Sequence, residues 1–202
     1  VQTNVLLATK QELNTLRPLS KRLGVGVTNC IVAGIALAIM RLHKKDRLMM
    51  GNSYHGRYEN TLQHIHGCLA HSMPVMARIP ESGRVEDYLS EFGRVQDLMM
   101  DKYIRVIPYI LQKYSMAMLQ GGALNIRLNE RPVMIAGTEA KTVKKMGVVQ
   151  KLPLYTSLDI EPDGWHLRFM SAQWGEEDLK ALAASARKII LGMAEKELIS
   201  EL

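Results

Sequence analysis

The strongest constraint on the fold is the stretch 31–42, which is apolar on nearly every side of a helix. A helix of this kind has no polar face for solvent, so other elements must cover it all round. The stretch is too short to span a bilayer. Strand-like runs lie before it at 3–8 and after it at 47–50. We therefore predict an α/β fold in which a central helix packs on a sheet.

The residues before the central helix carry clear start and stop signals. Thr9 and Glu12 have the spacing of a capping box, and leucines follow at helical intervals. Pro18 should kink this first helix or reset its start. After a glycine break, Thr28 is expected to cap the central helix.

The remaining chain alternates strand and helix patterns. Ser82 is expected to cap a helix that continues to Met99, and Pro108 to begin another that runs to about residue 118. Glu161 to Gly164, Glu-Pro-Asp-Gly, favours a hairpin turn. Strands are expected at 72–79, 123–128, 154–160 and 165–171, an extended loop at 136–150, and a final amphipathic helix at 176–198.

Two glycine-containing motifs follow the strand at 47–50. The first is Gly51-Asn-Ser-Tyr-His-Gly56-Arg57, and the second is His66-Gly67-Cys-Leu-Ala-His71-Ser72-Met-Pro74. Glycines at such positions permit positive φ or close backbone approach, so Gly51, Gly56 and Gly67 are predicted to shape these loops.

These motifs and the order of elements resemble the condensation domains of nonribosomal peptide synthetases, which belong to the chloramphenicol acetyltransferase-like superfamily. The resemblance implies a chloramphenicol acetyltransferase-like lobe, a mixed sheet with packed helices. It covers nearly the whole chain, so residues 1–202 are expected to form a single C-terminal condensation-like lobe. The loop at 136–150 would be a latch that roofs a substrate tunnel, or simply a surface loop.

The family's active-site signature, His-His-x-x-x-Asp-Gly, does not occur in these residues. The resemblance therefore implies the C-terminal half of a condensation-type acyltransferase, which forms an amide or ester bond from a carrier-bound acyl thioester. This half would supply tunnel wall and carrier-docking surface, and no catalytic residue is assigned to it. The chain begins at Val1 rather than Met, which we interpret as a sign that it was cut from a longer protein.

Candidate substrate-channel residues are Arg57, His71 and Ser72. Arg57 follows Gly56 as in the family, although its guanidinium would equally serve to satisfy carbonyls of a bent loop. His71 stands where the family has Asn, Ser72 where it has Thr, and Met76 where it has Arg. These departures keep other readings open: a stand-alone O- or N-acyltransferase, or a non-catalytic module that binds a carrier or partner.

The expected partners follow from the same resemblance. They are an N-terminal condensation lobe and a peptidyl or acyl carrier protein bearing phosphopantetheine, with no cofactor bound directly by this chain. The net charge of +6 suits an acidic partner, but no basic block is flanked by aromatic residues, so nucleic acid is not expected. No membrane association is expected, whereas self-association through an exposed lobe interface is. Cys30 and Cys68, both in apolar surroundings, favour a cytoplasmic protein with free thiols.

A metal site is the alternative use of the middle segment. His64, His66, Cys68 and His71 offer nitrogen and sulfur ligands, with His55 nearby. Their spacing matches no established zinc pattern, and a strand would send alternate residues to opposite faces. No metal is therefore predicted.

Overall fold

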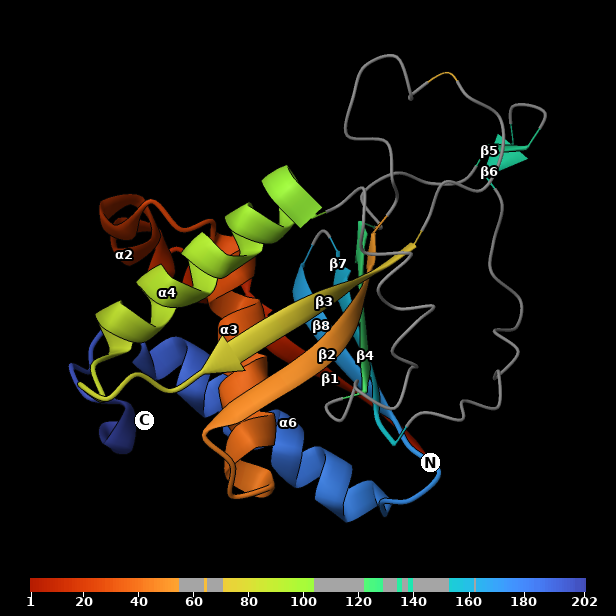
Figure 1. Cartoon of the computed structure of the whole chain (residues 1–202). Coiled ribbons are helices and arrows are strands. Elements are labelled where there is room, and N and C mark those ends of the chain that lie inside the picture. The colour runs from red at the N-terminus through yellow and green to blue at the C-terminus, as the bar shows by residue number, and fades with distance from the viewer. Residues whose placement is uncertain are drawn as a thin grey trace.

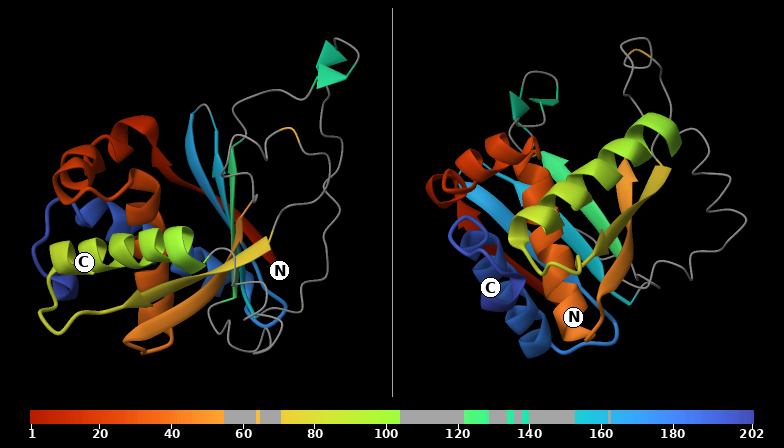
Figure 2. Two further views of the ribbon diagram at one scale, coloured as in Figure 1. Left: turned by 45° about the horizontal axis from the view of Figure 1, so that its top comes forward. Right: turned by 60° about the vertical axis from the view of Figure 1, so that its left-hand side comes forward.

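The computed structural model has an α/β architecture with one six-stranded mixed sheet and helices gathered on one of its faces (Figures 1 and 2). It describes residues 1–54, 64, 71–103, 122–128, 134–135, 138–139, 153–161 and 163–202. In sheet order, the strands are β1 (Gln2–Thr9), β8 (Gly164–Met170), β7 (Tyr155–Ile160), β4 (Ala123–Leu128), β2 (Arg47–Tyr54) and β3 (His71–Arg78). The predicted fold class is confirmed.

The sheet combines antiparallel flanks with a parallel centre. Strands β1, β8 and β7 are antiparallel neighbours, and so are β2 and β3 at the other end. The three central strands, β7, β4 and β2, run parallel. Their carboxyl ends therefore lie at one edge of the sheet, where ligands of open α/β sheets commonly bind.

The predicted capping box begins the first helical segment. The Glu12 amide donates to Thr9 Oγ1 at 3.2 Å, and the Thr9 amide donates to Glu12 Oε2 at 2.9 Å. The chain then forms two helices, α1 (Lys10–Leu13) and α2 (Leu16–Leu23), instead of one. Pro18 lies in the first turn of α2, where its missing N–H costs nothing, so the predicted reset is confirmed.

Helix α3 (Val27–Leu42) is central, as its composition predicted, and residues 30–40 are all buried. It begins two residues earlier than expected, because Gly26 and not Thr28 occupies the N-cap position. It packs against α6 (Glu176–Gly192), and the close approach needs a glycine at position 34, since a Cβ there would collide with Ile190.

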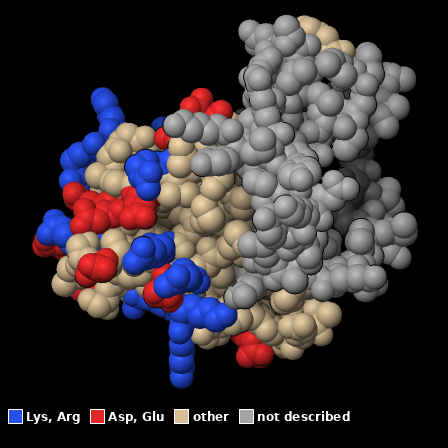
Figure 3. Space-filling model, viewed as in Figure 1, with Lys and Arg blue, Asp and Glu red and all other residues tan. Residues whose placement is uncertain are grey.

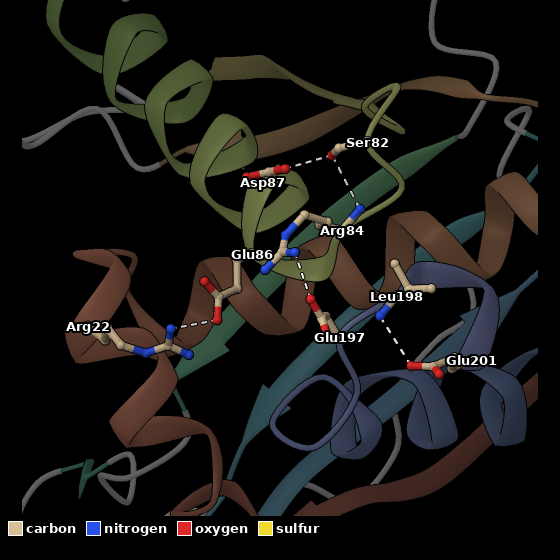
Figure 4. Close-up of polar contacts among 8 residues, drawn as sticks. All are labelled: Arg22, Ser82, Arg84, Glu86, Asp87, Glu197, Leu198 and Glu201. Carbon is tan, nitrogen blue, oxygen red and sulfur yellow. Dashed lines mark hydrogen bonds and ion pairs between the residues drawn. The ribbon is translucent and has the colours of Figure 1, made fainter.

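Helix α4 (Val85–Leu98) continues into a π-helical turn (Met99–Tyr103) and is anchored at its first turn. Ser82 does not cap it, because Arg84 is at the N-cap and the Ser82 hydroxyl donates to Asp87 at 2.6 Å. Figure 4 shows the ion pairs that tie this end to α2 and to the C-terminal segment, Arg22–Glu86 at 2.5 Å and Arg84–Glu197 at 2.6 Å.

The hairpin predicted around residues 161–164 is confirmed by the pairing of β7 with β8. The final helix is shorter than expected, since α6 ends at Gly192 and a 3₁₀ turn (Ile199–Glu201) follows. Cys30 is fully buried, as predicted. Cys68 and the helix expected from Pro108 lie outside the described residues. Of the loop at 136–150, only β6 (Thr138–Glu139) is described; it pairs with β5 (Met134–Ile135).

Within the described ranges, no single helix has the length and hydropathy needed to cross a bilayer. The segment from α1 to α3 meets the criterion only as two pieces joined at a bend of 104°.

Candidate functional site

The predicted site residues that can be placed lie together at one end of the β2–β3 pair. Gly51 is in β2, opposite Pro74 of β3, and its amide donates to the Gly122 carbonyl at 3.0 Å. His71 and Ser72 are the first residues of β3 and pair with Tyr54 and Ser53. The structure therefore brings the channel candidates His71 and Ser72 to the edge of the sheet where the parallel strands end.

Arg57, Gly56 and Gly67 lie outside the described residues, in the connection between β2 and β3. The same holds for His55, His66 and Cys68 of the possible metal cluster. His64 is exposed in a turn. The roles predicted for these residues stay predictions.

None of the described helices packs on the other face of the sheet, and a row of polar residues crosses that face. Leu158, Leu124 and Phe169 point into the helical core, so their neighbours in sequence occupy the opposite face. At one register these neighbours are Asn4 of β1, Arg168 of β8, Ser157 of β7 and Asn125 of β4. Asn52 of β2 pairs with Leu124 and therefore lies on the helix-facing side. Ser53 is the next residue and lies on the opposite face, where its position is paired with that of Ser72 in β3, so the row extends to these two positions. We call these six positions the polar row.

A buried ion pair lies within and beside the polar row. Arg168 Nη2 is 3.1 Å from Asp159 Oδ2, and the Ser157 hydroxyl donates to Asp159 Oδ1 at 3.0 Å. Asp159 is 0% exposed and Ser157 is 1% exposed, so the carboxylate depends on these partners for solvation. Because a buried carboxylate is costly unless it is paired, this arrangement fixes the direction of the Arg168 guanidinium.

The guanidinium keeps unused hydrogen-bonding capacity. Arg168 Nε is buried and has no hydrogen-bond partner among the described residues. With the amides of Asn4 and Asn125 and the hydroxyls of Ser53 and Ser157, it makes this face suited to neutral amide, carbonyl or hydroxyl groups. Among the described side chains on this face, no histidine contacts a serine, so no nucleophile–base pair is present.

A second polar cluster lies at the turn of the β7–β8 hairpin. His166 Nε2 is 3.1 Å from Asp163 Oδ1 and 3.9 Å from Glu161 Oε2. The hydrogen bond from His166 is the main reason that the pKa of Asp163 lies below its usual value. The three side chains could in principle hold a metal ion, because one nitrogen or oxygen atom from each lies within 4.8 Å of the others. A hydrogen bond between the imidazole and the Asp163 carboxylate already accounts for this geometry.

The sequence interpretation missed the polar row and its ion pair. The available signal was that polar residues occupy every second position in both strands of the hairpin. Ser157 pairs with Arg168, and Asp159 pairs with His166. Alternation of this kind equally describes a solvated strand face. Only the strand order, which brings in residues of β1 and β4, makes a continuous row.

Several solved structures have the same fold. The first condensation domain of the CDA synthetase superposes with a TM-score of 0.74 at 14% identity, covering 100% of this chain and 47% of that one. The epimerization domain from the third module of tyrocidine synthetase B gives 0.70 at 18% identity, covering 96% and 48%. The X-domain in complex with OxyB from teicoplanin biosynthesis gives 0.73 at 17%, covering 100% and 48%.

Neither a family model nor a curated protein sequence matches the chain. The chain spans about half the length of the solved structures that it resembles. The protein thus has the fold of one half of a condensation domain, consistent with the C-terminal lobe that the sequence resemblance predicted.

Proposed function

We propose that this chain is the C-terminal half of a condensation-type acyltransferase and that the polar row lines its substrate channel. The observation that carries the proposal is the sheet face on which no described helix packs. It holds an ion-paired guanidinium that is only 12% exposed and a line of amides and hydroxyls, in the fold of half a condensation domain. On a sheet face that is simply exposed to solvent, an aspartate side chain would itself be exposed, whereas Asp159 is fully buried.

In the proposed reaction, an amine or hydroxyl attacks the carbonyl carbon of an acyl thioester. The C–S bond breaks, the thiol leaves, and a base accepts the proton of the nucleophile. The partner lobe would supply that base, and this half would hold the substrate. The donor's phosphopantetheine arm contains amide groups, which are the hydrogen-bonding groups that the polar row suits. The carrier protein that bears the arm, and a cytoplasmic setting, belong to the proposal.

The test is acyl transfer by the complete product of the gene that encodes these residues. An acyl group is loaded as a thioester on a phosphopantetheinylated carrier protein, amine and alcohol acceptors are added, and the product is followed by mass spectrometry. The informative variant is Asn125→Ala, with the exposed Asn14→Ala on the helical side as matched control. We expect transfer to fall by about tenfold in the first and to stay unchanged in the second. Equal activity of both would contradict the channel role.

A partner-binding module of the same fold is the second candidate. It is favoured by one comparison, because the X-domain from teicoplanin biosynthesis was solved in complex with another protein, OxyB. The same assay separates the two candidates. A complete gene product that transfers no acyl group, yet binds a carrier protein in calorimetry, would favour the module.

A further inference from the structure

The outer edge of β3 has free backbone groups beside a groove. In the sheet order, β3 is terminal, and among the described residues no strand pairs with its outer side. The Ile79 amide donates inward to the Asp46 carbonyl at 2.8 Å. In an antiparallel ladder the bonded pairs alternate, so Ala77 also bonds inward, whereas the backbone groups of Met76 and Arg78 point outward.

Pro74 agrees with this assignment. It occupies one of the outward positions, where its missing N–H removes no bond to β2. The unpaired donors closest to the end of β3 are thus the amides of Met76 and Arg78, each accompanied by a carbonyl acceptor.

A groove of about 470 Å³ lies between this edge and α4. On the helix-facing side it is lined by Leu48 and Ala77 of the strands and by Phe92 and Val95 of the helix, and Met49 and Met76 border it from the other face of the strands. Methionine side chains adapt to different apolar partners.

The helix wall is held in place, because Tyr88 and Leu89 of α4 are buried in the core and the Tyr88 hydroxyl donates to the Ala33 carbonyl at 2.8 Å. The exposed ion pairs at the first turn of α4 (Figure 4) add little to this. On this side of the molecule, Figure 3 shows an uncharged surface between groups of charged side chains.

The charges at the end of the groove favour an acidic group in the occupant. Arg47 and Arg78 lie directly opposite each other on β2 and β3, an unfavourable like-charge pair. Asp46 contacts Arg47, whose hydrogen bond is the main cause that lowers the pKa of that carboxyl. Among the described residues Arg78 has no carboxylate within ion-pair distance, although its charge also helps to lower the pKa of Asp46. Glu91, the other charged group of the groove, lies on the α4 side.

We infer that the outer edge of β3 binds an extended peptide segment of a partner protein as a seventh strand of the sheet. Its backbone pairs with Met76 and Arg78, which is the β-augmentation mode of peptide recognition. The residue opposite Ala77 shares the face of Ala77, so it must be apolar and enters the groove beside Phe92 and Val95. The residue opposite Arg78 lies on the other face and is acidic. This inference does not depend on the proposed acyl transfer.

The test uses the whole chain and a fluorescein-labelled peptide with apolar residues at alternate positions and an aspartate between two of them. Binding is followed by fluorescence anisotropy. The discriminating variant is Met76→Pro, which removes an outward amide and leaves the bonds to β2 intact, as Pro74 does. The matched control is Met76→Ala, which shortens the same side chain but keeps the amide. We expect Met76→Pro to weaken binding by about tenfold relative to Met76→Ala.

A charge variant covers the case in which Met76→Pro does not fold, as judged by circular dichroism. Arg78→Glu should weaken the aspartate peptide by about fivefold and strengthen a peptide with lysine in its place. Equal affinity of Met76→Pro and Met76→Ala, or no binding of the aspartate peptide to the wild-type chain, would overturn the inference. So would a concentration-dependent dimer that Met76→Pro abolishes, because the edge would then be an interface between two copies.

Discussion

The two faces of the six-stranded sheet differ in what they do for the protein. The helix-facing side carries residues such as Leu158, Leu124 and Phe169, all 0% exposed and packed beneath α3 and α6. The opposite side carries the polar row and the Asp159–Arg168 pair. The first face supplies the apolar burial that makes the lobe fold. The second face buries a charge pair, which costs stability compared with apolar residues of similar size. We therefore infer that this pair has a role other than stabilising the fold.

The largest expected effect comes from neighbouring residues of β8 that lie on the two faces. Phe169→Ala should lower the free energy of unfolding by about 3–5 kcal/mol, because it leaves a cavity in a fully buried apolar site. Met170→Ala, one residue further and on the other face, should cost about 1 kcal/mol or less. Urea unfolding followed by circular dichroism measures both. Similar costs for the two variants would mean that the second face is a core in its own right.

The ion pair gives the next largest effect. Asp159→Ala should destabilise the chain by about 3 kcal/mol, because it leaves the Arg168 guanidinium, which is only 12% exposed, without its carboxylate partner. Replacing both groups by apolar residues, as in Asp159→Leu with Arg168→Met, should restore stability to within about 1 kcal/mol of the wild type.

The double variant sharpens the comparison of the two faces. If the ion pair serves only stability, the double variant keeps every measurable property of the complete gene product. If the pair belongs to a substrate channel, acyl transfer falls although the free energy of unfolding does not. The outcome in which stability stays low in the double variant would contradict the assignment of a costly, functional charge pair.

The sequence predicted those elements whose local signals agree with their tertiary setting. The all-round apolar stretch at 31–42 could only be a central helix, and the Glu-Pro-Asp-Gly turn could only join two neighbouring strands. Two predicted N-caps, Thr28 and Ser82, were wrong, and the hydroxyls of both residues can bond to groups other than the first amides of a helix. In the structure Ser82 bonds to Asp87 and to the Arg84 amide, as polar side chains near helix starts often do.

The candidate site was less predictable, because it depends on strand order. Asn4 and Asn125 are far apart in the sequence and meet in one row only because β8 and β7 lie between their strands. The family resemblance pointed to His71 and Ser72, which do reach the carboxyl edge of the sheet. It gave no reason to select Asp159 or Arg168, whose importance appears only when their burial is known.

A smaller effect is expected from the helix-facing side, where several buried polar atoms, Thr156 Oγ1 among them, have no hydrogen-bond partner among the described residues. Thr156 is 0% exposed on the core side of β7, and its hydroxyl has no hydrogen-bond partner. Thr156→Val keeps the shape and removes the unpaired group, so it should raise the free energy of unfolding by about 1 kcal/mol. On the other face, Ser157→Ala should lower it by about the same amount, because that hydroxyl donates to Asp159. Urea unfolding of the pair tests whether neighbouring residues respond with opposite signs.

The smallest expected effect concerns Cys30, buried in α3, whose burial raises the pKa of its thiol to about 11. A thiol with a raised pKa favours the folded state as long as it is protonated. Its contribution is therefore complete below about pH 8.5, the pKa of an unfolded cysteine, and is lost as the pH rises through 11. In a Cys68→Ser background, iodoacetamide at pH 8 should modify Cys30 only as fast as the chain opens, and urea should abolish the protection. Modification at the rate of a free thiol would show that the core beneath the sheet admits solvent. The contrast between a dry helical side and a polar opposite face would then fail.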